Sequence, residues 1–290
     1  MKIFLTDISD MNDDIMNKGL ELVPAYRKDK VERYRFKEDK ERSLAAGLLL
    51  NYATKLYSMS MSRQVKGKPE TYEAESMIGN VILNMQGNAR CEVKNNMKNN
   101  IDNIVNVKLE DLVDNYDNAY DYDIEYAGNG KPVYNNSDIH FNLSHAGDYV
   151  VCAVSDRAVG IDIEGPRKNA IKVAKRFFTQ AECDWIGDDN FRFSRVWTLK
   201  EAYAKLTGEG IAGTVSKVEF RHETGNEATS KTGGNVDEKD VVKNHFISRK
   251  DMASVVNMYI SGKKEKNVKI YELNIIKPEY AISAIEYLKN

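Results

Sequence analysis

The strongest constraint on how this chain folds comes from residues 159–164, VGIDIE, in which apolar residues alternate with acids. Side chains on a β-strand point to opposite faces in turn, so Asp162 and Glu164 share one face, about 7 Å apart along the strand. The opposite face, made of Val159, Ile161 and Ile163, is expected to point into a core. Two neighbouring carboxylates repel each other unless a cation lies between them, and Mg²⁺ suits such oxygen ligands. Taken alone, the same alternation is also typical of an edge strand with a solvated acidic face.

Composition excludes several classes of protein. The chain has 290 residues, of which 42% are hydrophobic, so it is long enough and apolar enough to bury a core. A net charge of -2 argues against a protein that coats nucleic acid. Cys91, Cys152 and Cys183 are scattered without a CxxC pair, which fits a reducing cytoplasm better than a disulfide framework or a zinc cluster. No apolar run approaches the ~20 residues of a membrane span, and Asp7 comes too early for a signal peptide.

Two segments near the N-terminus have opposite characters. Residues 27–42 mix basic residues with five acids, which is typical of a solvated helix with salt pairs; alternatively, the basic residues form a rim that meets phosphates. The basic residues are Arg27, Lys28, Lys30, Arg33, Arg35, Lys37, Lys40 and Arg42. Within residues 43–57, Leu44, Leu48, Tyr52 and Leu56 recur every fourth position, which predicts a buried amphipathic helix.

Residues 58–118 carry little periodicity, and we interpret them as an insertion or a long surface excursion. A second polar loop is expected at 223–240. Strands are expected at 1–7, 216–220, 268–275 and 280–285.

The middle of the chain predicts strands and turns. Residues 122–126 form an alternating strand, and the Gly-rich segment after them either lets backbone approach a phosphate, with Lys131 supplying charge, or is an ordinary tight turn. The apolar run 149–154 predicts a central strand buried on both faces. Ser144 and His145 are expected at the turn before it, where adjacency in sequence does not make them a catalytic pair.

Helices follow the acidic strand. One is expected from about Ile171, and Thr179 with Glu182 predicts a capping box for the next. A third helix, from Phe193, should end at Gly208. It places Trp197, Glu201 and Lys205 on one stripe, which is either a surface ion pair or, if desolvated, a poised acid–base pair.

Four of these pieces, in this order and at these spacings, resemble the 4′-phosphopantetheinyl transferases of the surfactin-synthetase-activating type. They are Gly130-Lys131-Pro132, Phe141-Asn142-Leu143-Ser144-His145, Gly160-Ile161-Asp162-Ile163-Glu164 and the stretch from Trp197 to Lys205. The resemblance covers roughly residues 20–57 and 120–221, and it does not explain the stretch 58–118. Ala146 departs from the family, in which many members have a second serine here.

The resemblance implies an α/β fold, a pseudo-two-fold pair of similar α/β halves in one cytoplasmic monomer. We expect one half at 1–135, with a long insertion at about 58–118, and a second at 136–290 that carries the metal-binding acids. The implied activity transfers the 4′-phosphopantetheine arm of coenzyme A to a serine of an apo acyl or peptidyl carrier protein. Neither a nucleic acid nor a membrane is expected as a partner.

The resemblance also assigns roles to residues. Asp162, Glu164 and Glu201 would hold one Mg²⁺, and Glu201 could also take the proton from the carrier serine. Lys205 would steady negative charge on the α-phosphate. The nucleotide end of coenzyme A would meet Lys131, Ser144, His145, Arg27, Lys30, Arg42 and Ser43. Two other hypotheses are a different Mg²⁺-dependent phosphotransferase or phosphodiesterase, and a non-catalytic scaffold that binds carrier proteins.

Overall fold

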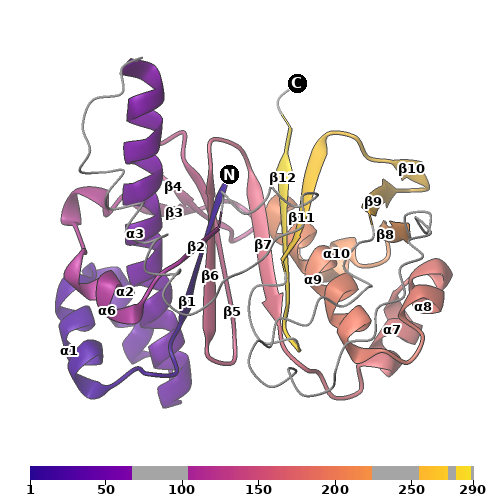
Figure 1. Cartoon of the computed structure of the whole chain (residues 1–290), viewed down its shortest axis with the longest axis horizontal. Helices are drawn as coiled ribbons and strands as arrows, with labels where there is room; N and C mark the ends of the chain where they lie inside the picture. Colours follow the sequence, from indigo (N-terminus) through magenta and orange to yellow (C-terminus); the bar gives the residue numbers. More distant parts are fainter. Residues whose placement is uncertain (67–103, 224–254, 274–278, 289–290) are drawn as a thin grey trace, which may run out of the picture.

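The computed structural model describes residues 1–66, 104–223, 255–273 and 279–288, which form a mixed α/β fold (Figure 1). The strands are β1 (Lys2–Asp7), β2 (Ile104–Asn106), β3 (Ile124–Tyr126), β4 (Pro132–Tyr134), β5 (His140–Ala146), β6 (Tyr149–Ser155), β7 (Val159–Glu164), β8 (Val218–Glu223), β9 (Val255–Ile260), β10 (Lys263–Lys264), β11 (Val268–Leu273) and β12 (Ala281–Tyr287). The helices are α1 (Asp13–Leu22), α2 (Ala25–Glu32), α3 (Lys37–Lys66), α6 (Leu109–Asp114), α7 (Ala170–Phe177), α8 (Gln180–Ile186), α9 (Asn190–Thr207) and α10 (Ile211–Thr214), with a 3₁₀-helix, η2 (Asn118–Tyr120). In this part of the chain no helix is long and apolar enough to cross a membrane.

The first sheet joins the start of the chain to its middle. Its strand order is β2-β1-β6-β5, and β1 runs antiparallel to β6 along its whole length, with Phe4 opposite Cys152. Every residue of β6 is buried, which confirms the apolar strand predicted at 149–154. Because β1 pairs with β6, the expected halves 1–135 and 136–290 share this sheet.

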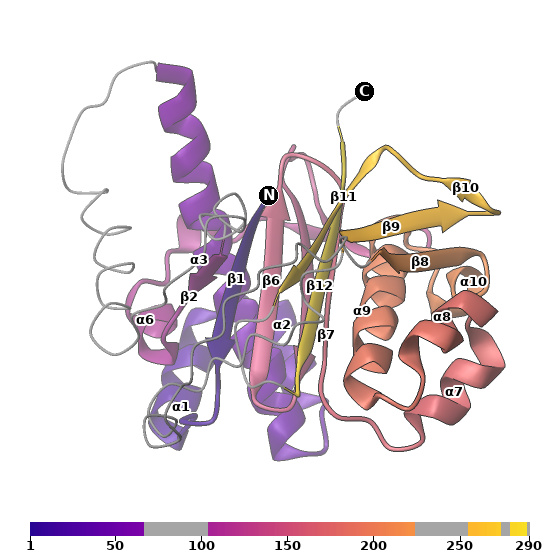
Figure 2. The same ribbon diagram turned by 45° about the vertical axis from the view of Figure 1, so that its right-hand side comes forward.

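Two sheets lie between two long helices, as Figures 1 and 2 show. Helix α3 covers one face of the first sheet, where Leu44 packs in the same cluster as Phe4. The other face packs through Val151 against Ile161 of the second sheet, whose strand order is β11-β12-β7. Helix α9 covers the far side of this second sheet through residues that include Leu199. The fold therefore stacks helix, sheet, sheet and helix, with apolar clusters between successive layers.

Strand β7 has the two-faced character that its sequence predicts. Val159, Ile161 and Ile163 are at most 1% exposed and belong to the cluster between the two sheets, as expected. On the opposite face, Gly160 lies directly under α9. A Cβ atom added there would sit 1.9 Å from the carbonyl oxygen of Ala202. Glycine is therefore what allows α9 to lie close against β7.

The N-terminal region differs from the sequence-based expectation at two places. Residues 27–42 form two helices instead of one, because α2 ends at Glu32 and α3 begins at Lys37. Helix α3 continues to Lys66, with Met61 packed against the core, and β2 pairs in parallel with β1. The two ends of the stretch 58–118 are therefore part of the fold and are not a surface excursion, because apolar residues in both ends pack into the cluster between α3 and the first sheet. Residues 67–103 and the loop expected at 223–240 lie outside the described residues, apart from Glu223 at the end of β8.

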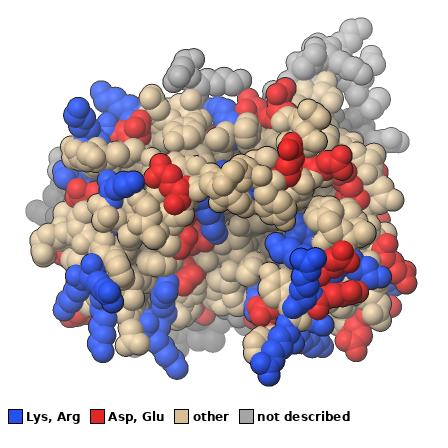
Figure 3. Space-filling view, turned by 180° about the vertical axis from the view of Figure 1, so that it is seen from behind, with Lys and Arg blue, Asp and Glu red and all other residues tan. Residues whose placement is uncertain are grey.

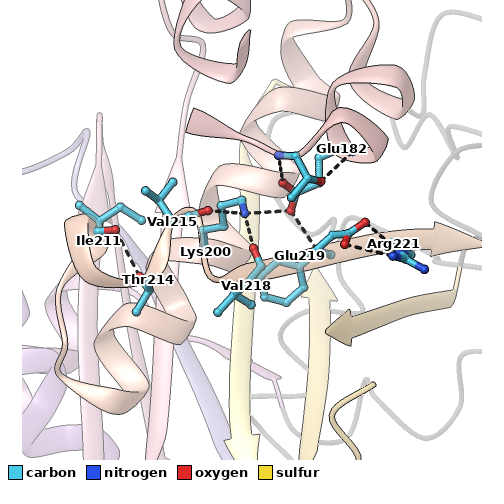
Figure 4. A network of polar contacts seen from close by, with 10 residues as sticks. Glu182, Lys200, Ile211, Thr214, Val215, Val218, Glu219 and Arg221 are labelled. Atoms are coloured by element: carbon cyan, nitrogen blue, oxygen red, sulfur yellow. Dashed lines mark hydrogen bonds and ion pairs between the residues drawn. The ribbon is translucent and has the colours of Figure 1, made fainter. Parts of the chain in front are cut away.

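Helix α9 is anchored by a buried ion pair (Figure 4). Lys200 and Glu182 are fully buried, with 2.9 Å between Nζ and Oε1. The Lys200 ammonium also donates to the carbonyls of Val215 and Val218, so each of its three protons has an acceptor. Glu182 closes the predicted capping box with Thr179 at the start of α8. One charged pair thus ties α8 and the start of β8 to the helix that carries Glu201.

Lys200→Met should lower the free energy of unfolding by about 3–5 kcal/mol, because it leaves the Glu182 carboxylate buried without its cation. Chemical denaturation monitored by circular dichroism measures this change. Lys217→Met is the matched control, since Lys217 is 64% exposed in its pair with Glu209, and it should shift stability by less than about 0.5 kcal/mol. Equal stability of the two variants would contradict the anchoring role of Lys200.

Candidate functional site

A pocket of about 310 Å³ forms where β5, β7 and α9 meet. We call it the acidic pocket, and its lining residues are Leu143, Ser144, His145, Asp162, Glu164, Trp197, Glu201 and Lys205. The two acids of β7 and the acid of α9, distant in sequence, thus line one cavity. Trp197, Glu201 and Lys205 all reach it, as expected for residues on one stripe of a helix.

Asp162 is the most strongly held of the three acids. It is 5% exposed, and its Oδ1 accepts hydrogen bonds from Lys205 Nζ at 2.7 Å and from Ser144 Oγ at 2.8 Å. Its other oxygen, Oδ2, is buried and has no hydrogen-bond partner among the described residues. The ion partner of Lys205 is therefore Asp162 on β7, whereas the helix stripe alone suggested Glu201.

The two glutamates are half-buried beside this carboxylate. Burial raises the pKa of Glu164 and of Glu201 above the usual range, and the negative charge of Asp162 raises both pKa values further. Arg167 offsets part of the charge, since its guanidinium lies 3.6 Å from Glu164 and stacks over the ring of Trp197. Three carboxylates so placed favour a cation among them.

The residues of the acidic pocket fit a hard divalent cation in one respect. A buried carboxylate oxygen without a partner, Asp162 Oδ2, is costly unless something positive meets it, and carboxylate oxygens are the protein ligands that Mg²⁺ accepts. The protein side chains alone do not complete a metal site, however. Within the described ranges, no group of three or more His, Cys, Asp or Glu is disposed so that it could hold a metal ion by itself. A bound ion would therefore need ligands from a substrate or from water.

A larger pocket, of about 380 Å³, adjoins the acidic pocket, because His145, Glu201 and Lys205 line both. We call it the basic pocket, since its lining includes Arg27, Lys30, Lys131, His145 and Lys205. Tyr26, Tyr34 and Tyr126 line it as well. Clustered cations in a cleft focus a positive potential, which attracts polyanions. Most of the residues predicted to meet the nucleotide therefore come together here.

Arg27 and Ser43 offer unsatisfied polar atoms in the basic pocket. Arg27 is only 6% exposed, although a solvated helix was one expectation for this segment. Its side chain lies against Gly47 of α3, where the absence of a Cβ atom leaves room for it. Neither Arg27 Nε nor Ser43 Oγ has a hydrogen-bond partner among the described residues. Burial, reinforced by the charge of Arg27, lowers the pKa of Lys30. Such groups are suited to receive an anionic ligand.

Lys131, His145 and Arg42 complete the predicted set. The Lys131 ammonium donates to the carbonyls of Val159 and Leu206, at the start of β7 and near the end of α9, and burial lowers its pKa to about 8. Burial also lowers the pKa of His145, and the nearby charge of Arg42 lowers it further. Arg42 itself does not line the basic pocket; it bonds to Asp39 and to the carbonyl of Gly147.

Sequence reasoning misplaced Ser144 and His145 and missed two other residues. The turn expected at Ser144 and His145 is wrong, since both lie within β5, whose pairing with β6 extends to Ala146. The two-residue period of a strand puts Asn142 on the same face as Ser144, and Asn142 Oδ1 accepts from the backbone of β7. Arg167 follows a Gly-Pro break, where no periodic pattern indicated that it would return to Glu164.

Part of the chain is similar to a known protein family. Residues 158–254 match the model of the 4′-phosphopantetheinyl transferase superfamily. The predicted resemblance is confirmed. This segment contains the three acids and Lys205, whereas the basic pocket draws largely on residues outside it.

Curated phosphopantetheinyl transferases align with parts of the chain. The 4′-phosphopantetheinyl transferase psf-1 of Bacillus pumilus is 43% identical over 111 residues, 36% of this chain and 48% of that protein. The enzyme named gsp from Aneurinibacillus migulanus is 42% identical over 28% of this chain and 36% of its own length. Sfp of Bacillus subtilis strain 168 is 38% identical over 26% of this chain and 36% of its own. The chain thus spans less than half the length of these relatives.

Lys131→Gln tests whether the basic pocket binds anions through Lys131. A lysine is charged below its pKa, so the wild-type protein should bind pyrophosphate more tightly than the variant below pH 8 and lose this advantage as the pH rises above about 8. Isothermal titration of both proteins from pH 6.5 to 9.5 gives the ratio of affinities, in which the ligand's own ionisation cancels. A ratio that does not change with pH would contradict this role.

Proposed function

We propose that this protein transfers the 4′-phosphopantetheine arm of coenzyme A to a serine of an apo acyl or peptidyl carrier protein and releases adenosine 3′,5′-bisphosphate. The observation that carries the proposal is the convergence of three acids from β7 and α9 beside a pocket lined with cations. Coenzyme A has a diphosphate between a phosphorylated nucleotide and a thiol-bearing arm. Its nucleotide phosphate suits a pocket lined with cations, and its diphosphate suits carboxylates that can hold a metal ion. The similarity of residues 158–254 to the phosphopantetheinyl transferases supports the same activity.

The basic pocket would receive the nucleotide end of coenzyme A. Lys131, Lys30 and His145 would contact its 3′-phosphate, and the hydroxyl of Ser43 and the buried guanidinium of Arg27 have hydrogen-bonding capacity to spare. Charge-assisted hydrogen bonds to phosphate are stronger than neutral ones. Binding at this end would hold the diphosphate next to the acidic pocket, which shares four residues with the basic pocket: Leu143, His145, Glu201 and Lys205.

Asp162, Glu164 and Glu201 would hold one Mg²⁺ against the diphosphate. Such an ion neutralises charge on the transferring and leaving oxygens and orients them. Glu201 would accept the proton of the carrier serine, directly or through a water. Lys205, at the wall shared by the two pockets, would stabilise the negative charge that develops on the α-phosphate.

The charge of the surface supports an acidic protein as the partner. Carrier proteins are usually acidic, and basic residues attract such partners from a distance. On the face shown in Figure 3, Lys and Arg gather in two groups along the lower edge. Helix α7 also carries Lys175 and Arg176 in its last turn beside the exposed ring of Phe177. These features suit an acidic protein.

Mass spectrometry of a carrier protein separates this function from its alternatives. The protein is incubated with an apo-carrier, coenzyme A and Mg²⁺, and the carrier is weighed. A gain of one phosphopantetheine arm is expected. Cleavage of coenzyme A without any carrier would indicate a phosphodiesterase, and binding of the carrier without a mass change would indicate a scaffold; either result would overturn the proposal.

Asp162→Ala should abolish carrier modification, and added Mg²⁺ should not restore it, because the substitution removes an oxygen ligand and the partner of Lys205 together. Initial rates at several Mg²⁺ concentrations measure this. Asp188→Ala, which removes an exposed acid before α9, is the control and should keep its activity. Near-normal turnover of the Asp162 variant would show that the acidic pocket is not the reaction site.

A further inference from the structure

We propose that Asn142 is a positioning residue: its side-chain amide holds strand β7 in place of a neighbouring strand and thereby fixes the acidic pocket relative to the basic pocket. The inference rests on the proposed function for its effect on transfer, whereas the contact itself is independent of that function. It follows from the hydrogen bonds along one edge of β7.

Strand β7 lies at the end of its sheet in the described part of the chain, where β12 is its single strand partner. In an antiparallel pair, alternate residues turn their backbone N–H and C=O groups away from the neighbouring strand. On β7, Val159 and Ile161 do so, because their backbone atoms bind side chains from other elements. Both residues are buried, so these backbone groups need partners inside the protein.

Side chains from three other elements supply these partners. Asn142 on β5 binds the backbone of Ile161, with 2.9 Å between Oδ1 and the nitrogen. Lys205 of α9 donates to the carbonyl of Ile161 at 3.3 Å, and Lys131, just before β4, donates to the carbonyl of Val159 at 3.2 Å. A backbone N–H can only donate, so the amide oxygen of Asn142 must face it. Neither lysine could replace this oxygen, because an ammonium has no acceptor.

The bond between Asn142 and Ile161 crosses from one side of the site to the other. The basic pocket takes Arg27 and His145 from α2 and β5, on the side of the first sheet, whereas the acids come from β7 and α9, on the side of the second. Asn142 is 7% exposed and lines the basic pocket, and its partner directly precedes Asp162. The distance between the bound nucleotide and the acids therefore depends on this bond.

Loss of the bond should loosen β7 locally and slow transfer without releasing the nucleotide. The net contribution of one buried hydrogen bond corresponds to a change of up to about tenfold in an equilibrium constant. A displacement of about 1 Å between reacting groups can lower a rate about 100-fold. The residues that would contact the nucleotide do not lie on β7, so their affinity for it should change little.

Three variants isolate the acceptor of Asn142. Asn142→Ala removes it, and Asn142→Asp keeps an oxygen for the N–H of Ile161. Asn51→Ala is the matched control, because Asn51 is also a buried asparagine whose side chain accepts from a backbone N–H, that of Asp117, and it lines neither pocket. Circular dichroism verifies the fold of each variant. Asn142→Leu, which is nearly the size of the native side chain, replaces the alanine variant if that variant does not fold.

Hydrogen exchange of single amides, followed by NMR without substrate, measures the hold on β7. We expect Asn142→Ala to speed exchange at Ile161 about 10-fold relative to Val151 of β6. Asn142→Asp should return the rate to within about twofold of the wild type, and Asn51→Ala should leave it unchanged.

Transfer and nucleotide binding measure the effect on the site. In the carrier assay, Asn142→Ala should lower kcat at least about 10-fold. Its affinity for adenosine 3′,5′-bisphosphate, measured by calorimetry in EDTA, should stay within about threefold of the wild-type value. Asn51→Ala should keep both quantities.

Each other result overturns the inference. Exchange at Ile161 that Asn142→Ala does not speed, or that Asn142→Asp does not restore, would show that the amide oxygen does not hold β7. An unchanged kcat despite faster exchange would remove the positioning role, and equal losses of kcat and nucleotide affinity would make Asn142 a ligand contact. A wild-type protein that modifies no carrier would overturn the proposed function, whereas the exchange experiment would still decide whether Asn142 holds β7.

Discussion

The close approach of helix α9 to strand β7 is the constraint on which the site depends. Gly160 makes the contact possible, since any side chain there would run into the backbone of α9 at Ala202. The contact sets the distance between Asp162 on the strand and Lys205 on the helix, which is short enough for an ion pair of 2.7 Å. Lys200 holds the same helix from the opposite side through Glu182. Helix α9 is therefore fixed on both sides of the residues that face the pockets.

The electrostatics of the two pockets follow from this packing. Three carboxylates share the acidic pocket, and two cations, Lys205 and Arg167, are paired with two of them. The third, Glu201, has its pKa raised by burial and by the neighbouring carboxylates, and faces the pocket. The basic pocket next to it has an electrostatic potential of the opposite sign. Opposite potentials side by side suit a ligand that brings phosphates on one side and a cation on the other.

Local patterns in the sequence predicted the local features of the structure. The alternation in β7, the capping box at Thr179 and the end of α9 at Gly208, which has a φ of +76°, each depend on a few neighbouring residues, and all were found as expected. The convergence of Asp162, Glu164 and Glu201 came from a resemblance to a family, since no local rule brings β7 and α9 together.

Features that depend on distant parts of the chain could not be predicted. The parallel pairing of β1 with β2, separated by most of the first hundred residues, has no local signal. The same holds for Ser144, whose partners are Asp162 on a neighbouring strand and Lys205 on a helix.

The central claim is that the acids of β7 and α9 converge to hold one divalent cation against a diphosphate. Anomalous diffraction from crystals soaked with Mn²⁺ and coenzyme A tests it most directly. The account predicts one strong anomalous peak within coordination distance of Asp162 Oδ2, Glu164 and Glu201, with diphosphate oxygens completing the shell. A peak elsewhere, or coenzyme A bound with the three carboxylates directed apart and no ion between them, would contradict it.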